Sequence, residues 1–142
     1  MRKTFAWATL LAMLFGACNR AVDPADPLYR TWQWTQTEYK DGRIVDHAIT
    51  EFRIVTFRPN GMILYGANGR YAACCSPNRF RRKGSTLDFT NVESIPVSPV
   101  DDNKCYLVDC LLQGDSWQIL MLDDAQLVLE TPFGKYVYQP YP

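Results

Sequence analysis

Hydrophobic and polar residues alternate with a period of two along most of the chain beyond residue 30, and no segment keeps a helical period. This alternation is typical of strands that bury one face. Turn residues separate the alternating segments, among them Asn60-Gly61, a pair that favours hairpins. The pattern predicts strands at residues 31–39, 52–58, 62–65, 71–75, 86–90, 105–112, 117–122, 127–130 and 136–138.

Short strands joined one after another by tight turns predict an all-β domain over residues 28–142. A meander of about eight strands exposes its edges unless it closes, so we expect a small antiparallel up-and-down β-barrel. A β-sandwich is the alternative, although the Cys…Trp…Cys spacing of immunoglobulin domains is missing. A short turn at residues 27–29 is expected to plug one end, and residues 91–103 are expected to form a long loop.

An uninterrupted apolar run distinguishes the start of the chain from this alternating pattern. Two basic residues precede the run at residues 5–15, and the small pair Gly16-Ala17 leads from it to Cys18. A basic start, a short apolar stretch and small residues predict an export signal peptide at residues 1–17. The run is too short to span a bilayer comfortably, which argues against a retained membrane helix.

Because a cysteine follows the small pair, this segment resembles the lipobox of bacterial lipoproteins. The resemblance implies that Cys18 carries acyl chains and becomes the first residue of the mature protein; ordinary secretion is the alternative. Two or more acyl chains hold a protein stably on a bilayer. Polar residues and prolines predict that residues 18–27 are the lipidated cysteine and a flexible tether. Asn19 replaces the aspartate linked to inner-membrane retention, so we expect the cell envelope, with the outer membrane favoured.

The charge balance bears on the partners to expect. The chain has 15 basic and 15 acidic residues, and loss of the signal peptide leaves a slight acidic excess. This balance gives no reason to expect nucleic acid, and the lipid is expected to supply the membrane attachment. One basic run, Arg-Phe-Arg-Arg-Lys at residues 79–83, could bind an anion, a sugar phosphate or an anionic lipid head group. The alternative is a solubilising hairpin tip beside a sheet edge.

Four further cysteines fit an exported chain, in which cysteines usually form disulfides. Cys74 and Cys75 are adjacent, and Cys105 and Cys110 are five residues apart, so within strands the members of each pair point to opposite faces. Two disulfides between the two segments are predicted, with the pairing left open, and each would stabilise the fold by about 3–4 kcal/mol. A zinc site of four thiolates is the alternative, but it normally needs C-x2-C pairs, which this chain lacks.

Candidate catalytic residues are few. The only histidine, His47, lies in a polar connection and is expected to be solvated, and no nucleophile elbow accompanies it. The carboxylate pairs Asp101-Asp102 and Asp123-Asp124 fall where a loop and a turn are expected. The sequence contains no phosphate-binding loop, no dinucleotide-binding motif and no metal-ligand spacing. We therefore expect no enzyme activity, no cofactor and no metal.

The spacing of aromatic and turn residues resembles the lipocalin-like lipoproteins of Bacteroidetes-type bacteria. The resemblance rests on Leu28-x-x-x-Trp32, on residues 55–61 (Val-Thr-Phe-Arg-Pro-Asn-Gly) and on Trp117-x-Ile119-x-x-Leu122-x-x-x-x-Leu127-x-Leu129. It covers residues 28–139 and implies a calyx-like barrel that holds a small apolar ligand. The family pattern has glycine two residues before the first tryptophan, where this chain has Arg30. The larger side chain of Arg30 bears on how closely the floor of the barrel can pack.

Aromatic residues are the remaining candidates for a binding site. If they point inward, they line a pocket for a small hydrophobic ligand; the alternative is that they only fill the core. The candidates are Trp32, Trp34, Tyr65, Trp117, Tyr136 and Tyr138. The sequence thus predicts either a membrane-anchored binding module or a filled barrel that docks another component of the cell envelope. A cavity of about 300 Å3 or more would favour the binding module.

Overall fold

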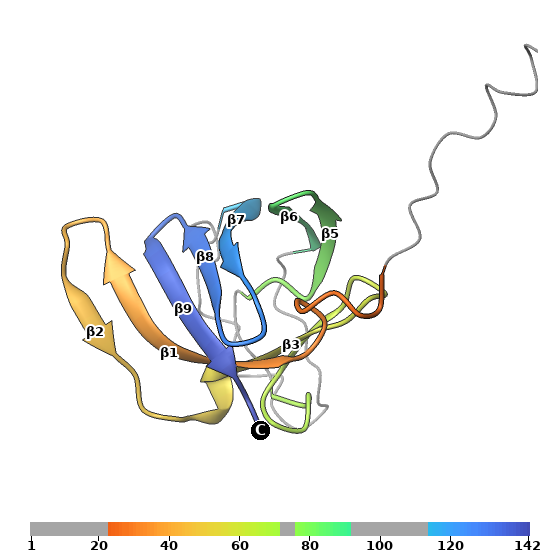
Figure 1. Cartoon of the computed structure of the whole chain (residues 1–142), viewed down its shortest axis with the longest axis horizontal. Coiled ribbons are helices and arrows are strands. Elements are labelled where there is room, and N and C mark those ends of the chain that lie inside the picture. Colours follow the sequence, from red (N-terminus) through yellow and green to blue (C-terminus); the bar gives the residue numbers. More distant parts are fainter. Residues whose placement is uncertain (1–22, 72–75, 92–113) are drawn as a thin grey trace, which may run out of the picture.

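The computed structural model describes residues 23–71, 76–91 and 114–142, which form an antiparallel β-barrel (Figure 1). The strands in chain order are β1 (Thr31–Tyr39), β2 (Ile44–Asp46), β3 (Ile54–Phe57), β4 (Ile63–Tyr65), β5 (Arg79–Lys83), β6 (Thr86–Asn91), β7 (Ser116–Leu122), β8 (Leu127–Thr131) and β9 (Gly134–Pro140). A 3-10 helix of three residues, η1 (Glu51–Arg53), precedes β3. The predicted all-β class and the small barrel of about eight strands are confirmed.

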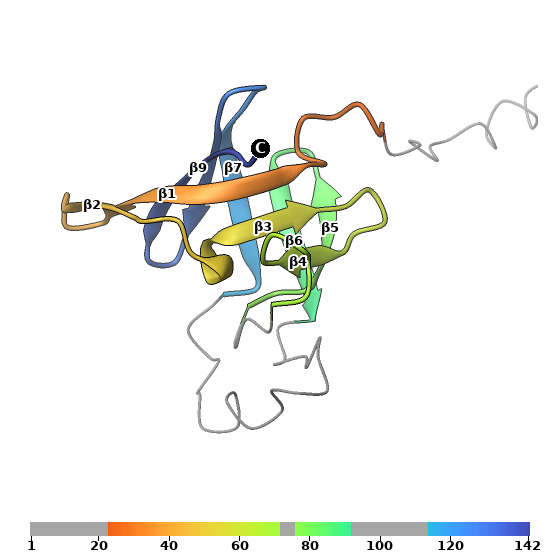
Figure 2. The ribbon, with the colours of Figure 1, turned by 90° about the horizontal axis from the view of Figure 1, so that it is seen from below.

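Eight of the strands follow one another around the barrel in an up-and-down order. The path runs β4-β3-β1-β9-β8-β7-β6-β5, and β2 lies off this path, paired with β1. The two ends of the path meet at a bridge between Met62 and Arg79, beside which the N–H of Ile63 donates to the C=O of Asn78 at 2.8 Å. Strands β1 and β3 lie across β5, β6 and β7 (Figure 2). The sheet is therefore nearly closed, which removes most of its free edge.

A hairpin that the sequence pattern did not predict follows β1. The chain turns at Asp41-Gly42, where Gly42 has a φ of +84° that favours glycine, and returns along β1 as β2. Thr37 of β1 lies opposite Val45 of β2. Because β2 has only three residues, its alternation is too short to distinguish it from a polar connection.

Two other expected strands differ from the structure. The strand expected at residues 52–58 begins at Ile54, because η1 occupies the residues before it. Of the strand expected at residues 71–75, only Tyr71 is described, and it lies outside any strand. The remainder of that segment and the strand expected at residues 105–112 fall outside the described residues.

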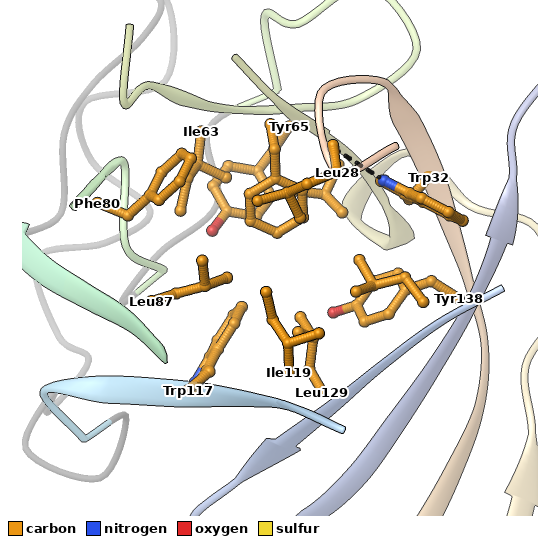
Figure 3. Packing of buried hydrophobic residues seen from close by; sticks show 13 residues of the cluster. Leu28, Trp32, Ile63, Tyr65, Phe80, Leu87, Trp117, Ile119, Leu129 and Tyr138 are labelled. Carbon is orange, nitrogen blue, oxygen red and sulfur yellow. Dashed lines mark hydrogen bonds between the residues drawn. The ribbon is translucent and has the colours of Figure 1, made fainter. Parts of the chain in front are cut away.

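Large apolar side chains fill the interior of the barrel (Figure 3). Phe57 of β3 and Phe80 of β5 meet edge to face, with 5.6 Å between ring centroids. The buried cluster contains Leu28, Trp32, Val55, Phe57, Ile63, Tyr65, Phe80, Leu87, Trp117, Ile119, Leu127, Leu129 and Tyr138. Most of the interior is thus occupied by the protein's own side chains, as in a close-packed core.

Leu28 and Trp32 form the closed floor of the barrel. Leu28 sits in the turn before β1 with no exposed surface, and its C=O accepts a hydrogen bond from Trp32 Nε1 at 3.1 Å. The Arg30 guanidinium lies 5.6 Å from the centre of the Trp32 ring and donates to the C=O and to Oδ1 of Asp124, both at 3.1 Å. The floor is therefore closely packed although Arg30 stands where the lipocalin-like pattern has glycine.

The last part of the expected flexible tether, residues 23–27, is folded rather than extended. The N–H of Asp26 donates to the C=O of Asp23 at 3.1 Å, and the N–H of Tyr29 donates to the C=O of Asp26 at 3.0 Å. The Asp26 carboxylate also forms an ion pair with Arg82 of β5. Aspartate favours such turns because its side chain bonds the nearby backbone. The folded domain therefore begins before residue 28.

Candidate ligand-binding recess

A recess of about 180 Å3 lies beside the packed core, and we call it the aromatic recess. Phe52, Arg53, Val55 and Ser76 contribute to its wall. Five of the six aromatic residues predicted as a binding site line it, namely Trp34, Tyr65, Trp117, Tyr136 and Tyr138. The sixth, Trp32, belongs to the floor and does not reach the recess. The structure thus brings most of the predicted site together in one place.

A β-bulge in β1 sets which side chains of this strand face inward. The pairing of β1 with β9 shifts register between Trp34 and Gln36, so the alternation changes phase there. Trp32 is buried before the bulge, and Thr37 is buried after it, with 1% of its surface exposed. The Trp34 indole N–H donates to the C=O of Gln36 at 2.9 Å, which fixes the ring at the bulge.

Ring contacts hold Trp34 in the wall of the recess. Its ring centroid lies 4.3 Å from that of Tyr136, with an interplanar angle of 30°. The ring of His47 meets Trp34 edge to face at 4.6 Å. Farther along the wall, Trp117 lies 6.4 Å from Tyr136 and meets Phe89 edge to face at 4.8 Å. Such tilted and edge-to-face pairs are favourable arrangements for aromatic rings.

Two buried tyrosines give the recess polar atoms that stay uncharged. Burial raises the pKa of Tyr138 well above its ordinary value, and the neighbouring phenols of Tyr65 and Tyr136 raise that pKa further. Burial also raises the pKa of Tyr65, against the opposing effect of a hydrogen bond with Ser76. The Tyr65 hydroxyl donates to the C=O of Pro77 at 2.6 Å. Both phenols therefore remain neutral throughout the physiological pH range.

Two buried N–H groups of the recess residues have no hydrogen-bond partner among the described residues. They are Nε of Arg53 and Nε1 of Trp117. The Arg53 guanidinium is held from another side, because Nη1 donates to the C=O of Ala48 at 2.9 Å and the group lies 4.7 Å from the centre of the Phe52 ring. A buried donor without an acceptor costs about 1–3 kcal/mol. An acceptor atom supplied by a ligand would recover that free energy.

His47 lies in the loop after β2, as expected, but it is half-buried against Trp34 rather than fully solvated. Its Nε2 is 2.7 Å from Oγ1 of the buried Thr37, and its backbone N–H donates to the C=O of Thr35. Burial lowers the pKa of His47, and the charge of Arg53 lowers it further, while Asp46 acts in the opposite direction. Sequence reasoning missed this contact because it depends on the short strand β2, which brings His47 back to β1.

The other predicted sites have structural roles or lie outside the described residues. Asp123 Oδ1 accepts backbone N–H groups from Ala125 and Gln126 at 2.8 Å, and Asp124 binds Arg30, so this carboxylate pair organises a turn. The remaining predicted residues, Cys18, Cys74, Cys75, Cys105, Cys110, Asp101 and Asp102, fall outside the described ranges. Within those ranges, no three or more His, Cys, Asp or Glu side chains gather as metal ligands would.

No protein-family model, no curated protein and no solved structure matches the chain. The resemblance to lipocalin-like lipoproteins therefore remains a prediction from the residues that carry it. Among the described residues, no helix is long and apolar enough to cross a membrane.

Proposed function

We propose that the protein is an exported lipoprotein whose lipocalin-like barrel binds a small, mainly apolar ligand in the aromatic recess. One observation carries this proposal: the recess combines five aromatic side chains with two buried N–H donors that lack partners among the described residues. Ligand sites are typically apolar with a few placed polar groups. The export signal and the lipid anchor at Cys18 are predicted from the sequence of residues 1–18.

The size of the recess limits what it can hold. Its volume of about 180 Å3 does not reach the cavity of about 300 Å3 that would favour a binding module over a filled barrel, so size alone does not support a ligand of typical dimensions. An apolar cavity of about 150 Å3 is known to bind benzene. The inserted part of the ligand is therefore a single ring or a short branched chain. A planar ring would extend the stack that Trp34 forms with Tyr136.

The donors define the polar part of the ligand. Nε of Arg53 and Nε1 of Trp117 both donate, so the matching group on the ligand is a hydrogen-bond acceptor such as a carbonyl or a carboxylate. The positive charge of Arg53 favours the carboxylate, because hydrogen bonds between charged groups are the stronger ones. The chemical class is thus a small ring compound with an acceptor group.

Two measurements on the mature, tag-free protein test ligand binding. Native mass spectrometry should show a copurifying small molecule, and benzoate should bind more tightly than toluene, which has the ring without the acceptor. Trp117→Phe keeps a ring but removes one donor, and it should weaken benzoate binding about tenfold, as loss of a hydrogen bond to a charged group does. Arg53→Gln should act in the same direction.

Arg58→Gln is the matched control, because Arg58 is exposed just beyond β3 and does not line the recess. It should leave benzoate binding unchanged. If the wild-type protein carries no small molecule and binds neither benzoate nor toluene, the recess is not a ligand site. If Arg53→Gln and Arg58→Gln weaken benzoate binding equally, benzoate responds only to the net charge of the protein and not to the recess.

A filled barrel that docks another envelope component is the second candidate, and the packed interior favours it. The segment from β2 to η1 exposes Ile44, Ile49 and Phe52, with 59%, 65% and 45% of their surfaces accessible. This candidate predicts that a photo-crosslinker at Ile49 gives one defined product in intact cells. Ile44→Ser should remove that product, while benzoate should have no effect on it, because Ile44 is exposed and does not line the recess.

Lipidation is tested separately from binding. The intact mass of the protein purified from its own membrane should correspond to residues 18–142 plus diacylglycerol and an additional acyl chain. Cys18→Ser should abolish this modification and release the protein from the membrane fraction, because no transmembrane helix is expected to hold it. An unmodified Cys18 in the wild-type protein would refute the anchor and leave ligand binding unaffected.

A further inference from the structure

A second, larger cleft of about 570 Å3 lies on the outside of the barrel, where the described chain begins. Its walls come from three places: the first folded residues, Asp23 and Asp26; the turn at residues 59–61; and β5, with Arg79 and Arg81. We call it the arginine cleft. It contains most of the basic run that the sequence singled out, and the proposed ligand binding does not use it.

An ion pair fixes the start of the domain to this cleft. Nη1 of Arg82 contacts Oδ2 of Asp26, and only 24% and 25% of the two side chains are exposed. Nε of Arg82 donates to the C=O of Gly84 at 2.9 Å, which orients the guanidinium. Asp26 therefore neutralises Arg82 and holds the incoming chain against β5. The third arginine of the run is thus structural and is not available to a ligand.

Arg79 and Arg81 differ from Arg82 in having no side-chain partner in the part of the chain that the structure describes. Both are exposed and, being two residues apart in a strand, project to the same side of β5, while Phe80 between them is buried. Among the described residues, neither guanidinium has a hydrogen-bond or ion-pair partner, whereas Lys83 binds Asp88 at 2.6 Å. Among the described residues, the cleft thus presents two guanidinium groups without partners on the same side of β5, an arrangement suited to phosphate oxygens.

The proposed lipid anchor places this cleft close to a membrane. Asp23, which lines the cleft, is five positions after Cys18, and a chain spans at most about 3.6 Å per residue, so Asp23 lies within about 18 Å of the acylated cysteine. Figures 1 and 2 both show the start of the described chain beside β5, at the end of the molecule opposite the hairpin of β1 and β2.

We propose that Arg79 and Arg81 bind the phosphate groups of anionic lipids in the bilayer that carries the anchor, so that the arginine cleft faces the membrane. This inference rests on the proposed lipidation of Cys18. The contact needs little intrinsic affinity, because a short tether gives the cleft a millimolar or higher effective concentration of head groups. Each arginine near an anionic surface raises the ratio of bound to free protein about fivefold, the equivalent of ~1 kcal/mol.

The orientation of the lipidated, full mature protein in nanodiscs tests this proposal. A gadolinium chelate on a lipid head group broadens amide NMR signals according to their distance from the surface. The tether alone keeps β5 nearer to the bilayer surface than the turn at residues 40–43 is. The measured quantity is therefore the ratio of signal broadening at residues 79–83 to signal broadening at residues 40–43, and how this ratio changes with the lipid. Replacing phosphatidylcholine with phosphatidylcholine–phosphatidylglycerol should raise this ratio about threefold or more. Adding 0.5 M salt should reverse the rise.

Two double variants with the same change in net charge separate the cleft from general attraction. Arg79→Gln with Arg81→Gln should abolish the rise, and Lys40→Gln with Arg43→Gln, in the distant turn between β1 and β2, should leave it intact. The inference is wrong if the ratio is the same in both lipid mixtures, or if the first variant keeps the rise. It is also wrong if inorganic phosphate shifts the Arg79 and Arg81 signals and the anionic lipid does not.

The intact mass of the nanodisc sample distinguishes failure of this inference from failure of the proposed function. A protein that lacks acyl chains on Cys18 refutes the lipid anchor and, with it, the orientation. A fully acylated protein whose ratio does not respond to anionic lipid refutes the orientation alone. Benzoate binding in the aromatic recess is independent of both results.

Discussion

The floor of the barrel and the aromatic recess each use a tryptophan from β1, and the two residues have different surroundings. Trp32 is fully buried, bonded to the turn at Leu28 and covered by Arg30. Trp34 is half-buried, and its partners are other rings that border an empty volume. The same residue type on the same strand therefore closes the barrel at one position and lines a candidate site at the other.

This difference arises from what surrounds each ring rather than from the strand. The floor has a plug, because the turn before β1 inserts Leu28 into the core. At the recess the wall continues as polar or partly exposed groups, including Arg53 and Phe52. Packing at the floor is expected to contribute stability, and the looser arrangement at the recess is expected to contribute binding. Substitutions in the two regions should separate the two contributions.

The largest expected effect is at the floor. Trp32→Ala removes a large, fully buried side chain and its hydrogen bond to Leu28, and it should lower the free energy of unfolding by about 3–5 kcal/mol. Urea denaturation of the mature protein measures this change. If the variant does not fold, Trp32→Phe provides a graded alternative that still loses the hydrogen bond. A loss below about 1 kcal/mol for Trp32→Ala would contradict a closely packed floor.

A smaller loss of stability is expected at the recess. Trp34→Ala removes the contacts with Tyr136 and His47 but leaves a half-exposed position, so unfolding should become easier by about 1–2 kcal/mol. Benzoate binding, measured by titration calorimetry, should fall at least tenfold, since the ring forms part of the wall. Trp32→Phe is the comparison: it should reduce stability and leave benzoate affinity nearly unchanged. Equal effects of the two variants on affinity would remove the distinction between floor and recess.

Arg30→Gly tests whether the floor depends on the residue that departs from the family pattern. The change removes the guanidinium over Trp32 and two hydrogen bonds to Asp124. Because 37% of the arginine side chain is exposed, solvent weakens these interactions, and the expected loss is about 0.5–1 kcal/mol of unfolding free energy. Arg30→Lys should recover little of it, since an ammonium group cannot make the paired contact. A gain in stability with glycine would show that Arg30 strains the floor.

The smallest expected effect is a dependence of the free energy of unfolding on pH, through His47 beside the recess. The pKa of His47 is lowered in the folded protein, by burial first and by Arg53 second, so the unfolded chain binds the proton more tightly. His47 therefore contributes its stability fully above about pH 6.5, the ordinary histidine value, and loses it as the pH falls from there through the folded pKa. Urea denaturation at pH 8 and pH 5.5 should show this decrease. His47→Gln should diminish it, and Trp32→Phe should not change it.

Local patterns predicted much of the barrel, because the strands alternate in sequence and tight turns join them. The strands at β1 and at β7 to β9 lie close to their expected bounds, with polar turns such as Asp123-Asp124 between them. The plug at Leu28 followed from an apolar residue placed just before β1. These features depend on neighbours a few residues away, which a sequence pattern records.

Features that depend on distant contacts were not predicted. The three residues of β2 gave no alternation, so the contact between His47 and Trp34 was missed. The bulge in β1 depends on its pairing with β9, about a hundred residues later. Arg53 was expected within a strand and instead borders the recess from η1, with an Nε donor that has no partner among the described residues. The aromatic members of the site could be predicted from the sequence, whereas its polar members required the fold.

The pairing of β1 with β9 also bears on how the protein is made. Trp34 lies opposite Tyr138, so the barrel cannot close until the last strand is available to the first. Folds that depend on contacts between distant parts of the chain form slowly. A slowly folding chain stays unfolded long enough to pass through a narrow export channel, which the predicted signal peptide requires. The topology that closes the barrel is thus compatible with the export that residues 1–17 predict.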